Sequence, residues 1–165
     1  LDLDAFIPPE YIVNEGQKRE IYKRIAGIET VRERDDMRDE LLDRFGAIPV
    51  SVENLLRIAL IRVAAHRLYM TELKGKNERI IFTFRPDAPI VPERIPDFMK
   101  TYGNRLLFTA YGNPFFTYKY QKCNVIEKDS QALLSDTEQL LEAMAGLVDE
   151  SLQDKKCEKA HEMNK

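Results

Sequence analysis

In the first half of the chain, apolar residues recur every three to four positions, which is the period of an α-helix. We expect helices over residues 15–28, 30–45 and 51–68. Asn14 is placed to cap the first helix, and Gly46 suits the left-handed position that ends the second.

The third expected helix is the most apolar segment of the chain, and Ser51 can cap its first turn. Apolar residues recur along it at i, i+3, i+4, i+7, i+8 and i+11: Val52, Leu55, Leu56, Ala59, Leu60 and Val63. Further apolar residues widen this stripe: Ile58, Ile61, Ala65 and Leu68. We therefore expect a central helix that is contacted on more than one side.

After residue 69 the apolar period changes to two, which is the period of a β-strand. Strands are expected over residues 70–74, 79–84, 105–110 and 115–120. The first two are joined through Gly75-Lys76-Asn77, a hairpin signal, and the last two through Gly112-Asn113-Pro114. On the second strand, Ile80, Phe82 and Phe84 are expected to face the core together.

Two more helices complete the expected elements, a short one over residues 93–102 with Pro96 in its first turn and a last one over residues 130–152. Because helices come first and strands later, the order predicts an α+β fold. A three-helix N-terminal segment would pack with a small antiparallel sheet of about four strands, plus the short and the C-terminal helix.

We expect a single domain over residues 1–154 that begins with an extended arm, residues 1–13, and a polar, frayed tail over residues 155–165. The chain starts at Leu1 rather than at a methionine, so it is expected to be a piece of a much larger protein.

Composition is that of an ordinary soluble protein, with 44% apolar and 32% charged residues. The net charge of −3, with acids and bases mixed, weakly opposes nucleic-acid binding. No apolar run is long enough to span a membrane, and no signal peptide is visible, so a cytoplasmic protein is expected. Cys123 and Cys157 fit no metal-binding spacing and are interpreted as a reduced pair.

No catalytic residue, cofactor site or metal site is expected in this chain. The two histidines, His66 and His161, have no partner at ligand spacing, and no glycine-rich phosphate loop occurs. One acidic group can be considered for a divalent cation: Glu33, Asp35, Asp36, Asp39 and Glu40. A solvated helix face is favoured for it, because a straight helix splays such carboxylates apart and arginines interleave with them.

The segment from Glu40 to Pro49 carries three charges that the core does not need. On a helix, Met37, Leu41 and Phe45 cluster within about 80° of arc, and Asp43 points away from them. Glu40 and Arg44 flank the stripe and can pair at i,i+4. On the residues alone, both a solvated helix end and a surface for a partner remain open.

Three segments together resemble the C-terminal domain of the bacterial transcription-repair coupling factor (Mfd) family. They are Asp4-Ala5-Phe6-Ile7-Pro8-Pro9-Glu10-Tyr11-Ile12, then Arg19-Glu20-Ile21-Tyr22-Lys23-Arg24-Ile25, and then residues 40–49, followed by Val52, Asn54, Leu55 and Leu56. Their order and spacing match the family over about the first 70 residues; the part beyond carries no sharp motif.

The resemblance implies a non-catalytic regulatory domain of an ATP-dependent DNA translocase. Such a parent displaces stalled RNA polymerase from DNA lesions and recruits nucleotide excision repair through UvrA, with ATP and magnesium bound in its motor domains. The C-terminal domain is implied to act as a lid that docks on the parent's own UvrA-binding module and inhibits it. A monomer without direct contact to nucleic acid or membrane is expected.

The resemblance also gives the three charges a role. Glu40, Asp43 and Arg44 are expected to bind the UvrA-binding module, whose surface bears arginines in this family. Two alternatives remain, a nucleic-acid-binding accessory domain and a stand-alone protein-interaction module.

Overall fold

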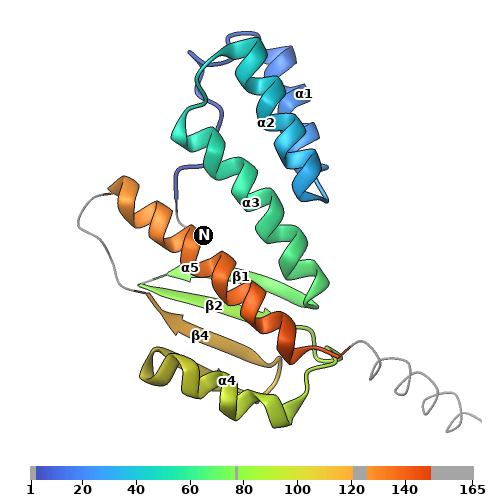
Figure 1. The fold of residues 1–165 in the computed structure, drawn as a ribbon, viewed down its shortest axis with the longest axis vertical. Coiled ribbons are helices and arrows are strands. Elements are labelled where there is room, and N and C mark those ends of the chain that lie inside the picture. Colours follow the sequence, from blue (N-terminus) through green and yellow to red (C-terminus); the bar gives the residue numbers. More distant parts are fainter. Residues whose placement is uncertain (1–2, 77, 121–125, 150–165) are drawn as a thin grey trace, which may run out of the picture.

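The structure is a computed structural model that describes residues 3–76, 78–120 and 126–149. It confirms the α+β fold (Figure 1). The helices are α1 (Glu15–Ala26), α2 (Val31–Phe45), α3 (Val50–Arg67), α4 (Ile95–Tyr102) and α5 (Ile126–Met144). The strands are β1 (Met70–Lys76), β2 (Arg79–Phe84), β3 (Leu106–Thr109) and β4 (Phe115–Lys119). Short 3-10 turns lie at Pro92–Arg94, Gly103–Arg105 and Ala145–Leu147.

Local sequence signals set the starts of the first two helices. The side chain of Asn14 accepts a hydrogen bond from the Gln17 amide at 3.0 Å, which confirms it as the cap of α1. Thr30 and Glu33 form a capping box at the start of α2. The expected cap at Ser51 is wrong, because Ser51 lies inside α3. The helix begins at Val50, and the extended residue before it is Pro49, which makes no side-chain cap hydrogen bond.

The C-terminal helix differs most from expectation, since it was expected over residues 130–152. It begins at Ile126 and ends at Met144, and a 3-10 turn then buries Leu147. The chain past this turn becomes extended because it pairs with a distant loop. The Val91 amide donates to the Leu147 carbonyl at 2.8 Å, and the Asp149 amide donates to Pro89 at 2.9 Å. Residues 150–152 lie outside the described ranges.

The four strands form one antiparallel sheet in the order β1-β2-β4-β3. Ile80, Phe82 and Phe84 are fully buried on β2, as expected from their alternation. The first hairpin is tighter than expected, because Gly75 and Lys76 belong to β1 and Lys76 pairs with Arg79. Asn77 lies outside the described residues.

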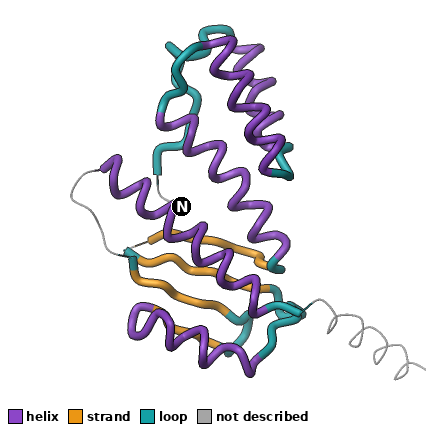
Figure 2. The backbone as a smooth tube through the Cα atoms, viewed as in Figure 1, coloured by secondary structure: helices purple, strands orange, loops and turns teal. Residues whose placement is uncertain are grey.

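Figure 2 shows α3 running from the other N-terminal helices to the sheet. Buried residues form two hydrophobic clusters, and α3 contributes to both. The helical cluster joins the arm, α1 and α2 to Val52, Leu56 and Ala59 of α3. The sheet cluster joins the strands, α4 and α5 to Ile61 of α3 and to Leu68, the residue that follows the helix. This confirms the expectation of a central helix contacted on several sides.

A polar seam ties α3 to α5 and to the arm between the two clusters. Arg57 binds Glu138 through two hydrogen bonds of 2.8 and 2.7 Å. Asn54, which is buried, donates to the Asp4 carbonyl at 2.9 Å and accepts from Gln131 at 3.2 Å. These bonds satisfy the polar groups that the seam buries.

Within the described ranges, no helix combines the length and apolar character needed to cross a membrane. The cysteines Cys123 and Cys157 and the expected tail, residues 155–165, lie outside the described residues.

Candidate partner-binding site

The three segments that carry the family resemblance, which we call the signature segments, lie far apart in the sequence. They meet at the helical end of the molecule. The Tyr22 hydroxyl accepts a hydrogen bond from the Ile7 amide at 2.7 Å, which ties the arm to α1. The Tyr11 hydroxyl donates toward the carbonyls of Leu41 and Gly46, at 3.1 and 3.3 Å, which ties the arm to the end of α2. The signature therefore encodes one packed unit around the end of α2.

The end of α2 has a buried side and a charged side. Met37 and Leu41 are buried, and Phe45 packs against Tyr11 with ring centroids 5.8 Å apart. Gly46 ends the helix with a positive φ of 81°, as expected, but its ψ of −154° is not that of a left-handed helix. Only glycine reaches this backbone region without strain.

Glu40 and Arg44 form the expected i,i+4 ion pair, with Arg44 Nη1 2.6 Å from Glu40 Oε1. A third residue, Arg24 on α1, joins them. Its guanidinium binds both carboxylate oxygens of Glu40, at 2.7 and 2.5 Å. We call Arg24, Glu40 and Arg44 the charge cluster. The sequence places Arg24 in a signature segment but does not show its partner, which depends on how α1 packs beside α2.

The two guanidinium groups stabilise the ionised form of Glu40. Hydrogen bonds from Arg24, and then from Arg44, lower the pKa of Glu40 from 4.5 to about 2. Arg44 is held on its other side by Phe45, since its guanidinium carbon lies 5.0 Å from the ring centroid.

Glu40 is therefore expected to stabilise the fold at neutral pH and to lose this effect in acid. Its folded pKa, about 2, lies below its ordinary 4.5, so the stabilisation is complete above pH 4.5 and lost as the pH falls to about 2. Urea unfolding of the chain and of Glu40→Gln at about pH 6 and about pH 3 measures this. The difference between the two proteins should shrink at the lower pH, and a constant difference would contradict it.

Asp43 is exposed on the outward side of α2. Within the described part of the chain, its carboxylate forms no hydrogen bond or ion pair, in contrast to that of Glu40. Leu42, beside it, leaves 48% of its surface exposed. The expected site residues are thus neighbours on one surface, but only Asp43 presents an unengaged carboxylate.

The acidic residues of α2 do not converge on a point where a cation could bind. Glu33 accepts hydrogen bonds from the amides of Glu29 and Thr30, at 2.8 and 3.1 Å, and Asp35 pairs with Arg34. Among the described residues, no three His, Cys, Asp or Glu side chains gather as a metal site would require.

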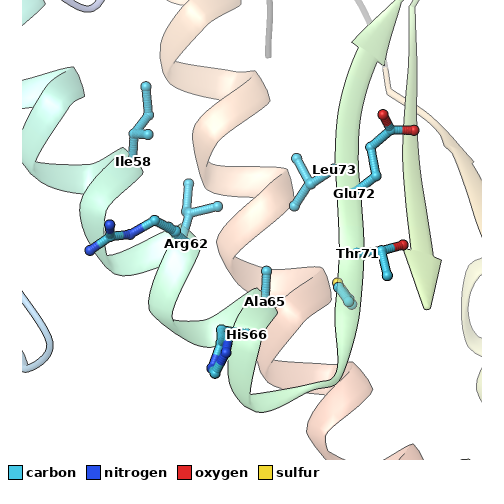
Figure 3. A pocket seen from close by; sticks show the side chains of 9 residues that line it. Ile58, Arg62, Ala65, His66, Thr71, Glu72 and Leu73 are labelled. Atoms are coloured by element: carbon cyan, nitrogen blue, oxygen red, sulfur yellow. The ribbon is translucent and has the colours of Figure 1, made fainter. Parts of the chain in front are cut away.

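A second candidate site is the groove between α3 and the edge strand β1, with a volume of about 410 Å³ (Figure 3). Its apolar lining comes from Ile58, Ile61, Ala65, Met70 and Leu73. Figure 3 shows the ends of Arg62 and His66 directed away from β1, and Thr71 and Glu72 directed away from α3. The groove offers apolar contact and no converging set of reactive groups.

Comparison with known proteins agrees with the resemblance. The family model described as the TRCF domain matches residues 1–95. The transcription-repair-coupling factor of Staphylococcus haemolyticus is 45% identical over 80 residues, which cover 48% of this chain and 7% of that protein. The one from Borreliella burgdorferi is 32% identical over 143 residues, which cover 83% of this chain and 13% of that protein.

A solved structure titled as a crystal structure of the C-terminal domain of transcription-repair coupling factor shares the fold. Its TM-score is 0.68 at 21% identity, and the match covers 86% of this chain and 90% of that one. The curated relatives are much longer, since the chain spans only 7% to 13% of their length. Because the family model covers more than half of the chain, the chain belongs to the TRCF domain family.

Proposed function

We propose that this chain is a non-catalytic docking domain that closes over the UvrA-binding module of its own, longer protein and inhibits it. The longer protein would be an ATP-dependent DNA translocase that displaces stalled RNA polymerase and recruits nucleotide excision repair. Its motor, with ATP and magnesium, would lie outside this chain, which spans a small part of its relatives. The domain itself needs no cofactor for this role.

The observation that carries the proposal is the unengaged carboxylate of Asp43 beside the charge cluster. A carboxylate on a rigid helix end is suited to a guanidinium from an arginine-bearing partner, because the pair can form two parallel charge-assisted hydrogen bonds. Arg44 can donate hydrogen bonds to an acceptor on the partner. The surface is therefore selective for a partner with a complementary charge pattern.

A polar surface also suits a domain that must open again. The exposed apolar residue beside Asp43 is Leu42, so apolar contact near the charges is limited. Contacts of this kind resemble the polar interfaces between domains that move relative to one another, whereas a large apolar interface would hold them shut.

The test is binding of the 165-residue chain to the separately expressed UvrA-binding module of its parent, by calorimetry. Asp43→Arg should weaken binding at least about tenfold, equivalent to about 1.4 kcal/mol, because it replaces an attraction by a repulsion. Glu142→Arg makes the same charge reversal on the exposed side of α5 and should leave binding unchanged.

Two results would contradict the proposal. One is absence of binding by the unmodified chain, even when a linker tethers it to the module. The other is equal binding by the Asp43→Arg and Glu142→Arg variants. Tight retention of the chain on labelled DNA at physiological salt would instead favour an accessory nucleic-acid-binding domain.

A further inference from the structure

The carboxylate of Glu40 is almost fully used within the chain. Oε1 accepts hydrogen bonds from Arg24 and from Arg44, at 2.7 and 2.6 Å, and Oε2 accepts one from Arg24 at 2.5 Å. A carboxylate has about four acceptor positions, so about one remains for a partner. Glu40 is therefore poorly placed to be a main acceptor for arginines of another surface.

We propose that Arg24 is a positioning residue of the docking surface: it fixes Glu40 from α1, and through Glu40 it holds Arg44 in the orientation that meets the partner. In this arrangement Asp43 is the carboxylate that takes up the partner's cation. The inference rests on the proposed function and assigns a different task to each charge.

Arg24 holds the Glu40 carboxylate in place from a second helix, α1. Its two nitrogens bind the two oxygens of one carboxylate, which defines the plane of that carboxylate as well as its position. Without Arg24, Glu40 and Arg44 would remain only as an ion pair between two long side chains on the exposed side of α2. Such pairs are weak and adopt several geometries.

The held position of Arg44 is defined on two sides. Glu40 binds one terminal nitrogen, and the guanidinium carbon lies 5.0 Å from the centroid of the Phe45 ring. Phe45 is itself packed against Tyr11, which is hydrogen-bonded to the end of α2. Arg44 is still 37% exposed, and a guanidinium has five N–H donors, so it can bind a further acceptor.

The charges specify the chemistry of the partner. Arg44 offers a positive charge and N–H donors, whereas Asp43 next to it offers a negative charge. The fitting partner surface has a guanidinium for Asp43 and, beside it, a carboxylate or carbonyl oxygen for Arg44. A uniformly basic surface would meet Arg44 unfavourably.

The experiment compares Arg24→Gln with Lys23→Gln, a matched control on the same exposed helix turn. The pKa of Glu40, followed by carboxyl NMR, should rise from about 2 toward 4.5 in Arg24→Gln and stay unchanged in Lys23→Gln. Affinity for the UvrA-binding module should fall about three- to tenfold in Arg24→Gln only.

Arg24→Lys separates geometry from charge, because lysine keeps the positive charge but cannot form the two-point contact. It should bind the module as weakly as Arg24→Gln, and full recovery of affinity would overturn the positioning role. A raised pKa of Glu40 with unchanged affinity in Arg24→Gln would overturn the inference and leave the proposed function standing. Absence of binding by the unmodified chain would overturn the proposed function and the inference with it.

Discussion

Replacing Phe116 with alanine is expected to lower the free energy of unfolding by about 3–5 kcal/mol. Its ring is fully buried on β4, and it meets the rings of Phe84, Phe98 and Phe108 at centroid distances of 5.9, 5.6 and 4.7 Å. These rings come from two neighbouring strands and from α4, so the cavity would open where sheet and helix join. Urea titration followed by circular dichroism measures the loss.

Two further variants test whether the loss of unfolding free energy comes from the buried ring of Phe116. Phe116→Leu keeps much of the buried volume and should cost clearly less than the alanine variant. Tyr111→Ala removes an aromatic ring that is 93% exposed and should leave stability nearly unchanged. If Phe116→Ala were no more destabilising than Tyr111→Ala, the ring would not be part of the core.

Gly46→Ala is expected to lower the free energy of unfolding by about 1–3 kcal/mol, because alanine is strained in this backbone region. The added methyl group meets no atom within 4 Å, so the cost comes from the backbone and not from a clash. Its φ of 81° and ψ of −154° belong almost only to glycine.

Gly146→Ala is the matched control, because its added methyl group also meets nothing within 4 Å but its φ is not positive. It should have little effect in the same urea titrations, and equal effects in the two variants would contradict the argument. Since Gly46 directs the chain away from α2 beside Tyr11, Gly46→Ala should also weaken any docking that uses the end of this helix.

The elements that were predicted well are those set by neighbours in the sequence. The cap at Asn14 and the burial of Ile80, Phe82 and Phe84 follow from local spacing. The expected end of α5 was wrong because that end is set by pairing with Pro89 and Val91, more than fifty positions away. No local pattern in the helix carries this information.

The same distinction applies to the candidate site. Glu40 and Arg44 were predicted as a pair because they are four residues apart on one helix. The hydrogen bond from Arg24 to Glu40 joins residues that are 16 positions apart in the sequence. It forms only when α1 and α2 pack side by side. The sequence therefore identified the charged residues, and the structure showed which of them pair within the chain and which does not.

The sharing of α3 between two clusters has a consequence for where this chain can be cut. The family match ends at residue 95, after all three signature segments and before β3, β4 and α5. A fragment trimmed to that boundary would lose Phe116 and Leu134, which cover β2 and the second half of α3. It would present Phe82 and Ile61 to water and β2 as a new sheet edge, which is a surface that promotes aggregation. Residues 1–95 are thus enough for the family to be recognised, but a longer segment must be expressed for the domain to fold.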